Sequence, residues 1–298
     1  MATTPTPTPT PITTNTTNLP RLTAACTPLT HQVDVLDEFG AMRRIWIPAE
    51  RALTVFVDKR ELVTLMTLGA APELLVLGYL RNQRLVDRVD DIESITVDWE
   101  VQAAAVKTRA GIERFDEKTA KRVVTTGCGQ GTVFGDLMGD LASIRLPAAD
   151  DPTARVSQQA LYGLLNAMRL QETTYKSAGS VHGCALFKQD ELVMFVEDVG
   201  RHNAIDTIAG WMWLNEVSGG DKIFYTTGRL TSEMVIKSAQ IGVPIVVSRS
   251  GITQMGHQLA HQLGLALFGR ATNRHFICYS GLDRFDSQPE PARAGVGV

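Results

Sequence analysis

The sequence predicts an α/β protein of the α+β kind, with a three-layer core and a β-rich N-terminal part. Two observations carry this prediction. From about residue 151 onward, segments with helical periodicity alternate with short apolar runs, which is typical of strands joined by crossover helices. Between residues 42 and 109, short β-type runs predominate instead. A chain of 298 residues with 44% hydrophobic content is long enough to bury two such cores.

Four β-type runs are predicted in the N-terminal part, at residues 45–47, 53–57, 61–68 and 95–105. One helix over residues 72–84 interrupts them. Pro72 suits the first turn of that helix, and Leu74, Leu75, Leu77 and Tyr79 supply its apolar face.

The second half begins with a helix over residues 157–171, where apolar side chains recur at helical spacing. Strands at 181–187 and 192–196 follow, and a short polar turn between them predicts an antiparallel hairpin. Helices at 203–217, 231–241 and 254–268 then alternate with strands at 223–226, 244–248 and 275–279. Right-handed crossovers between such strands predict a parallel or mixed sheet that is covered by helices.

Composition shifts divide the chain into five segments. Residues 1–25 are a Pro/Thr-rich tail that we expect to be disordered, and residues 26–126 are the β-rich N-terminal domain. Residues 127–152 form a Gly-rich cysteine loop and a linker, and residues 153–286 form the α/β core. Residues 287–298 are expected to be a second disordered tail.

Charge and hydropathy exclude several classes of protein. A formal net charge of −3 and a pI near 6.1 argue against nucleic-acid binding, which needs a basic face. The sequence has no apolar run of about 18 residues, so we expect no membrane span. It shows no secretion signal, and its four cysteines are scattered without disulfide-like spacing. We therefore expect a cytoplasmic location.

Cys128 lies between Gly127 and Gly129, with Gly131 two residues further on. Glycines allow a loop to present a small side chain at the surface, where a thiolate could attack or carry sulfur. The other interpretation is a buried cysteine beside an ordinary glycine-rich turn, and the residues alone leave both open.

The densest polar cluster follows the strand predicted at 192–196. It contains Asp198, Arg201, His202 and Asn203, just before a helix. The carboxyl ends of strands are where α/β proteins bind ligands. Asp198 or Asn203 could simply cap the helix, but a cap does not account for the whole group.

Basic turns follow the next strand ends. Gly228 and Arg229 come after one strand, and Ser248 and Arg249 come after the next. Arginine beside the amides of a helix start suits a phosphate, although each turn could also be a common strand-to-helix turn with a solvent-facing arginine. Because two such turns follow neighbouring strands, together they favour an anionic ligand. A third basic stretch consists of Arg270, Ala271, Thr272, Asn273, Arg274 and His275. It could close on a nucleotide, but the residues alone favour a plain charged loop.

No metal site is predicted. The sequence around His182 and Cys184 lacks the glutamate of a zinc deaminase, and no C-x-x-C is present anywhere. His257 and His261 are four residues apart, but the glutamate of H-E-x-x-H is missing between them.

Two segments together resemble the formate dehydrogenase accessory sulfurtransferases, the FdhD family. Residues 197–206 read EDVGRHNAID and resemble that family's EDVGRHNAxDK signature. Residues 227–239 read TGRLTSEMVIKSA and are similar to its SGR-x-S-x-EMV-x-K-x-A segment. The resemblance extends from about Pro48 to Phe285.

The resemblance implies a core similar to the cytidine deaminase fold, without its zinc chemistry. It also implies sulfur transfer: a cysteine desulfurase donates persulfide sulfur to Cys128. The sulfur then passes to a molybdenum cofactor with two molybdopterin guanine dinucleotide groups, for formate dehydrogenase. The family's cofactor-binding turn aligns with residues 270–275.

Two positions depart from the family pattern. Gly131 stands where a second loop cysteine is usual, so two paired thiols cannot act as a relay. The turn that reads Thr272, Asn273, Arg274, His275 differs from the usual basic-glycine pattern.

Two other functions stay open. A binding-only chaperone would hold the cofactor without transferring sulfur, and the missing cysteine favours it. A deaminase would be attractive by fold analogy alone. The resemblance is also compatible with a homodimer, to which the apolar residues 211–214 would contribute unless they simply fill the core.

Overall fold

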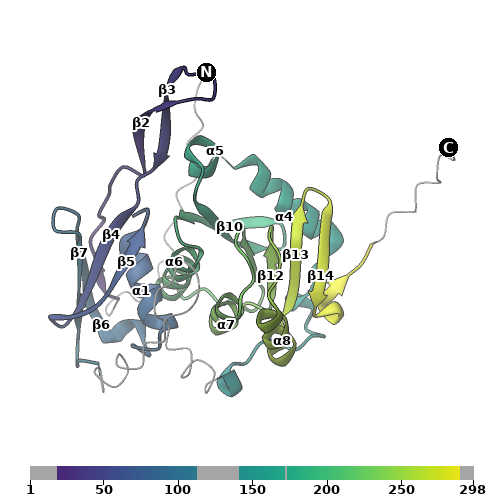
Figure 1. Ribbon diagram of the computed structural model, residues 1–298. Coiled ribbons are helices and arrows are strands. Elements are labelled where there is room, and N and C mark those ends of the chain that lie inside the picture. Colours follow the sequence, from purple (N-terminus) through teal and green to yellow (C-terminus); the bar gives the residue numbers. More distant parts are fainter. Residues whose placement is uncertain (1–18, 113–140, 172, 289–298) are drawn as a thin grey trace.

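The computed structural model describes residues 19–112, 141–171 and 173–288 (Figure 1). Cys128 lies outside these described residues. None of the helices in the described ranges is long and apolar enough to cross a membrane.

A mixed six-stranded sheet forms the centre of the core, in the order β10-β9-β11-β12-β13-β14. Neighbours β11, β12 and β13 are parallel, whereas β9 pairs antiparallel with both β10 and β11. The predicted mixed sheet is therefore confirmed. Its strands are β9 (His182–Lys188), β10 (Glu191–Asp198), β11 (Ile223–Thr226), β12 (Ile245–Ser248), β13 (Ala266–Thr272) and β14 (His275–Ser280).

Helices cover both faces of this sheet, which confirms the three layers. Helix α4 (Gln158–Leu170) packs on one face, and α6 (Arg201–Leu214), α7 (Ser232–Gln240) and α8 (Gln254–Leu263) pack on the other. Successive strand residues alternate between the two layers. Ala185 and Phe187 contact the cluster beneath α4, whereas Cys184 and Leu186 contact the cluster beneath α6, α7 and α8.

A second, five-stranded sheet forms the N-terminal part, in the order β1-β6-β7-β4-β5 (Figure 1). Helix α1 (Pro72–Asn82) packs between this sheet and α6, and the helix predicted at 72–84 is confirmed. The strands are β1 (Arg21–Leu22), β4 (Arg51–Val57), β5 (Arg60–Thr67), β6 (Ile92–Asp98) and β7 (Ala103–Thr108).

Helices α1 and α6 cross at two glycines, Gly78 and Gly210. A Cβ atom on Gly78 would lie 1.7 Å from the carbonyl oxygen of Asp206, and one on Gly210 would lie 2.0 Å from that of Leu74. The residues at 211–214 help to close the same contact. Met212 is buried in the core, and Trp213 and Leu214 pack against the N-terminal sheet, so these side chains fill the interior.

A hairpin of β2 (Thr30–Leu36) and β3 (Met42–Pro48) projects from the molecule beside the short helix α5 (Thr174–Ala178), as Figure 1 shows. The other short elements of the described residues are β8 (Val156–Ser157), which pairs with β15 (Phe285–Asp286), and the 3₁₀ turns η1 (Val89–Asp91), η2 (Leu141–Ser143), η3 (Pro152–Ala154) and η4 (Leu282–Arg284).

Several predicted boundaries were wrong. The helix predicted over 254–268 ends at Leu263, because Gly264 adopts a left-handed conformation that stops it. The apolar run that follows forms β13, so Arg270, Ala271 and Thr272 belong to a strand, and only Asn273 and Arg274 form the turn before β14.

The N-terminal part also differs from its prediction. The single strand predicted at 95–105 is two antiparallel strands, β6 and β7, because the chain turns between them with Gln102 at positive φ. Strand β2 was not predicted. Arg21 and Leu22 lie in the expected disordered tail but pair with β6, so that expectation is wrong for these residues.

Candidate functional site

Four parallel strands of the core sheet end at one edge of the molecule. β10, β11, β12 and β13 reach this edge at Asp198, Thr226, Ser248 and Thr272, and β9 starts there at His182. The turns predicted from the sequence therefore lie along a single edge, as expected for the carboxyl ends of parallel strands.

A cavity of about 250 Å³ lies at this edge, and we call it the edge cavity. Its walls combine an apolar floor with a polar and basic rim, which is typical of sites for organic ligands. The floor residues are Leu165, Met168, Phe195, Tyr225 and Ala271, and the rim includes Arg169, Thr173, Lys176, Thr227, Arg249, Thr272 and Asn273.

The charges around the edge cavity favour an anion. Arg169, Lys176 and Arg249 line it, against the one carboxylate of Glu197. That carboxylate accepts hydrogen bonds from the backbone N–H groups of Thr174 (2.5 Å) and Tyr175 (3.1 Å), where α5 begins. Glu197 is therefore hydrogen-bonded to the backbone of α5, and the side chains that line the cavity carry a net positive charge.

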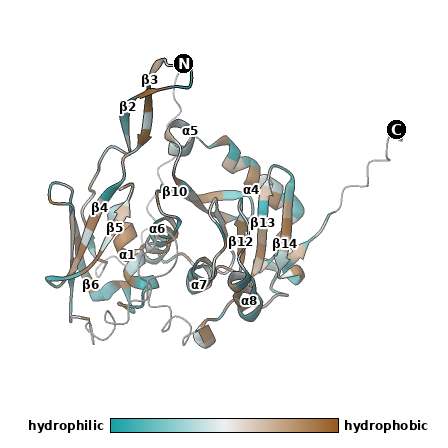
Figure 2. Cartoon of the chain, viewed as in Figure 1, coloured by the Kyte–Doolittle hydropathy of each residue, from teal (hydrophilic) through white to brown (hydrophobic). Residues whose placement is uncertain are grey.

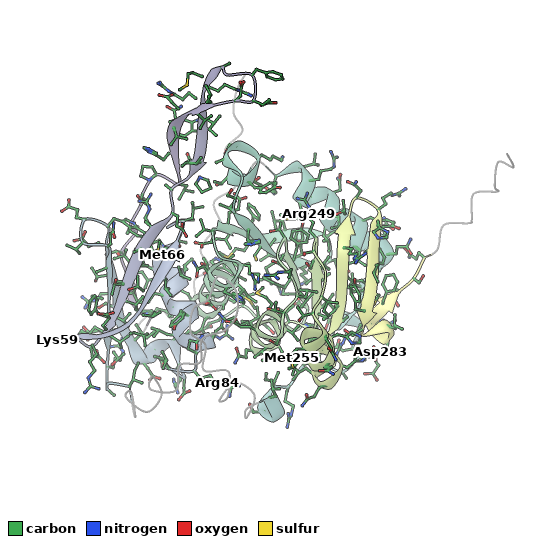
Figure 3. All side chains as sticks on the ribbon, viewed as in Figure 1. Lys59, Met66, Arg84, Arg249, Met255 and Asp283 are labelled. Atoms are coloured by element: carbon green, nitrogen blue, oxygen red, sulfur yellow. The ribbon has the colours of Figure 1, made fainter. Side chains whose placement is uncertain are left out.

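Arg249 follows β12 and reaches the cavity at the edge of the core sheet (Figure 3). Its guanidinium carbon lies 5.9 Å from the ring centre of Tyr175, which is within cation–π range. This contact ties the end of β12 to α5 and holds the charge over the cavity.

An adjoining groove of about 700 Å³ shares Leu165, Arg169 and Asn273 with the edge cavity. Arg274 lines this groove with its guanidinium carbon 5.1 Å from the ring centre of Tyr162. Of the stretch at 270–275, the structure thus brings Ala271, Thr272, Asn273 and Arg274 to the two depressions. Arg270 and His275 are exposed and are absent from the described lining of both.

Asp198 and Asn203 are almost fully buried and bond within the chain. The Asp198 carboxylate accepts from the Thr67 hydroxyl (2.5 Å), the Leu68 N–H (3.0 Å) and the Asn203 amide (2.7 Å). The Asn203 amide also donates to the Met66 carbonyl at 2.7 Å. Burial raises the pKa of Asp198, against the effect of these hydrogen bonds. Neither residue lines the edge cavity or the adjoining groove. Through these hydrogen bonds, both residues connect the N-terminal sheet to the core.

His202 is the first of a series of buried polar side chains that contact one another between α6 and α7. Its Nε2 lies 3.4 Å from Glu233, whose other oxygen lies 3.7 Å from the ammonium of Lys237. Lys237 in turn is 2.8 Å from Asp206, which accepts a hydrogen bond from Asn82 of α1. Burial lowers the pKa of His202 to about 2, and Lys237 adds to the effect, so the imidazole is neutral near pH 7.

Gly228 and Ser248 shape the edge. A Cβ atom on Gly228 would lie 2.6 Å from Cδ of Arg201, so a larger residue here would force the Arg201 side chain to shift. The Ser248 hydroxyl donates to the Gly228 carbonyl at 2.6 Å and joins the two turns. Arg229 is exposed, and together with Arg201 it lowers the pKa of His182, although burial is the larger cause.

The described thiols and imidazoles do not form a reactive or metal-binding group. Burial raises the pKa of Cys184 to about 12, so its thiol stays protonated. His257 contacts His261 and the Tyr279 carbonyl, each at 3.1 Å. Within the described ranges, no three His, Cys, Asp or Glu side chains converge as metal ligands.

Sequence reasoning missed three side chains of the edge cavity: Arg169, Lys176 and Tyr175. They come from the last turn of α4 and from α5, which precede β9 and follow none of the strand ends from which the site was predicted. The only available signal was the change from apolar to basic residues at the end of the helix predicted at 157–171.

Comparison with known proteins gives consistent results. The model of the FdhD/NarQ family matches residues 48–286. The sulfur carrier protein FdhD of Bacillus subtilis (strain 168) is 30% identical over 262 residues, which cover 83% of this chain and 98% of the relative. The protein of the same name from Bacillus licheniformis is 32% identical over 235 residues, which cover 79% and 88%.

A solved structure has the same fold. It is the crystal structure of a protein from Desulfotalea psychrophila described as a formate dehydrogenase accessory protein. The two superpose with a TM-score of 0.68 at 23% sequence identity, over 87% of this chain and 100% of the other. At this identity the similarity supports the fold alone.

Proposed function

Because this chain belongs to the FdhD/NarQ family, we propose that it is a sulfur carrier that serves formate dehydrogenase. Cys128 takes sulfur from a cysteine desulfurase and passes it to a molybdenum cofactor that carries two molybdopterin guanine dinucleotide groups. The cofactor is cargo, and the protein supplies the thiol and the binding surface.

The first step is a thiol–persulfide exchange. The Cys128 thiolate attacks the outer sulfur of the desulfurase persulfide, and a new S–S bond forms as the old one breaks. The desulfurase cysteine leaves as a thiolate, and Cys128 becomes a persulfide. No net oxidation occurs, so the single thiol at Cys128 is sufficient although Gly131 replaces the usual second cysteine.

The edge cavity is the observation that supports this cargo best. Its apolar floor suits a flat heterocycle, and Arg169, Lys176 and Arg249 suit the phosphates that follow such a ring in a dinucleotide. The adjoining groove with Arg274 would accept a second part of the same large molecule.

The experiment is an intact-mass measurement after incubation with a cysteine desulfurase and cysteine. The wild type should gain the mass of a sulfur atom, and Cys128→Ala should not. Cys26→Ala is the matched control, because Cys26 is an exposed thiol that is far from Cys128 in the sequence, and this variant should gain sulfur normally. Persulfide on Cys128→Ala would overturn the assignment.

A binding-only cofactor chaperone is the second candidate, and Gly131 in place of the second cysteine favours it. In that case neither the wild type nor Cys128→Ala would gain sulfur, while the affinity for a guanine nucleotide would remain. Zinc analysis of the same samples tests the deaminase alternative, which requires one bound zinc per chain.

A further inference from the structure

Glu197 is the only carboxylate among the described residues that line the edge cavity, where the other charged side chains are positive. Charge repulsion makes a carboxylate unfavourable in a site for an anion. The residue is only 8% exposed, so it is not a solvated surface charge. Its place in this cavity therefore indicates a role other than direct contact with an anionic ligand.

The carboxylate of Glu197 binds the beginning of α5. Its two oxygens accept hydrogen bonds from separate backbone N–H groups, that of Thr174 at 2.5 Å and that of Tyr175 at 3.1 Å. The next N–H group, of Lys176, donates at 3.1 Å to the hydroxyl of Thr173, which caps the helix. Glu197 thus satisfies the first two N–H groups of a helix start, which have no partner within the helix.

Helix α5 depends on polar contacts of this kind, because it buries none of its side chains. It has five residues, too few for a helix that is stable by itself. Figure 2 shows it mainly in pale and hydrophilic colours, since its sequence TYKSA contains no large aliphatic residue. It also contacts β3, and Tyr175 contacts Arg249. Glu197 supplies the hydrogen bonds that attach the α5 backbone to the end of β10.

We propose that Glu197 is a positioning residue for the edge cavity, which holds α5 so that the positive side chains stay on the rim. Lys176 lines the cavity from α5 itself. Arg249 is held by Tyr175, whose ring centre lies 5.9 Å from the guanidinium carbon. Lys176 therefore depends on α5 directly, and Arg249 depends on it through Tyr175. This inference rests on the proposed function, in which the cavity binds phosphates of the cargo.

Removal of the carboxylate has opposite effects in this proposal and in a purely electrostatic role. Glutamine has the size of glutamate, but it replaces one acceptor oxygen with an NH₂ group that would face a backbone N–H donor. If Glu197 acted through its charge alone, Glu197→Gln should tighten the binding of an anion about two- to fivefold. If it positions α5, Glu197→Gln should weaken binding about tenfold, because charge-assisted contacts to phosphate are lost.

Calorimetric titration with guanosine diphosphate distinguishes these two results. Glu191→Gln is the matched control, because it makes the same change at the exposed start of β10, outside the described lining of the cavity. It should leave the dissociation constant within about twofold of the wild type. Unchanged or tighter binding by Glu197→Gln would overturn the proposal.

A double-mutant cycle tests whether Glu197 acts through α5. In a chain that carries Tyr175→Ala and Lys176→Ala, α5 no longer contributes side chains to the rim. Adding Glu197→Gln to this chain should therefore not weaken nucleotide binding any further. An additional loss of about tenfold in this background would show that Glu197 acts by another route, and would overturn the positioning role.

A measurement without ligand separates this inference from the proposed function. A hydrogen bond to a carboxylate moves an amide proton downfield in NMR spectra, since such bonds are short and strong. The amide protons of Thr174 and Tyr175 should therefore move upfield in Glu197→Gln and stay in place in Glu191→Gln. If these shifts occurred but the wild type did not bind guanosine diphosphate, the proposed cargo would be contradicted and the attachment of α5 by Glu197 supported. Unmoved amide signals in Glu197→Gln would overturn the inference, whatever the nucleotide affinity.

Discussion

Asp198 at the end of β10 accepts a hydrogen bond from Thr67 at the end of β5, with 2.5 Å between oxygens that are 131 residues apart in sequence. The same carboxylate accepts from the Leu68 and Gly200 N–H groups. One buried aspartate thereby joins the N-terminal sheet to the edge of the core. The central polar signature of the sequence acts at least partly in holding the two sheets together.

Replacing Thr67 should weaken this junction. Thr67→Val keeps the shape of the side chain but removes the donor to Asp198, so the free energy of unfolding should fall by about 1.5–3 kcal/mol, as for a bond to a charged group. Urea denaturation measures the change. Thr64→Val, on the exposed side of the same strand, is the control and should cost about 0.5 kcal/mol or less. Equal effects of the two substitutions would contradict the junction.

The crossing of α1 and α6 should not tolerate a methyl group. Gly210→Ala would place Cβ 2.0 Å from the Leu74 carbonyl oxygen, which is backbone and cannot turn away. The helices would have to separate, at a cost of about 3 kcal/mol or more in unfolding free energy. Gly251→Ala, which meets nothing within 4 Å, is the matched control. Comparable melting temperatures for the two variants would refute the close crossing.

Stability should decrease in mild acid through His202. Its pKa is lowered to about 2 in the folded chain by burial, whereas the unfolded imidazole titrates near 6.5. Between these values the unfolded chain binds more protons, so the stabilising contribution is complete above about pH 6.5 and declines as the pH falls. The decline is about 1.4 kcal/mol per pH unit.

His202→Gln isolates this contribution, because glutamine does not titrate. Between pH 7 and pH 5, the wild type should lose about 2 kcal/mol more unfolding free energy than the variant does. Denaturant titrations at the two pH values measure the difference. Parallel losses in both proteins would show that His202 is not held neutral.

Arg249 should contribute to the affinity for a phosphate-bearing ligand. With guanosine diphosphate as the probe, Arg249→Ala should raise the dissociation constant about tenfold, since one charge-assisted contact is lost. Calorimetric titration measures it. Arg270→Ala removes an equally exposed charge at the end of the neighbouring strand without touching the cavity lining, and should change the constant less than threefold. If both substitutions weakened nucleotide binding equally, the effect would come from the net charge of the protein and not from a contact in the edge cavity.

Some predictions from the sequence depended on local patterns and held. The helix at 72–84 and the strand at 223–226 follow from apolar spacing and turn residues within a few positions. Other boundaries failed where a local pattern fits two structures. The apolar run before Gly269 is compatible both with the end of a helix and with a buried strand. Gly264 ends α8, so the run forms β13.

The candidate site likewise contains some features that local sequence patterns predict and others that they do not. The placement of Arg249 on this edge followed from the rule that parallel strands end together, and Arg249 lines the edge cavity. Asn273 also lines the cavity, but it follows β13, a strand that was not predicted. The partners of Asp198 and Asn203 could not be predicted, because Thr67 and Met66 belong to another sheet. Arg169 and Lys176 reach the cavity from helices that carry no motif.

The sequence by itself determined the family and most of the helices and strands of the core, apart from α5 and β13. The tertiary structure decided which polar residues of the 197–206 signature line a cavity and which are buried in hydrogen bonds that join the two sheets. The reason is physical: periodicity and turn chemistry act between near neighbours in the chain. Burial and hydrogen-bond partners, by contrast, are set by surfaces that folding brings together from distant segments.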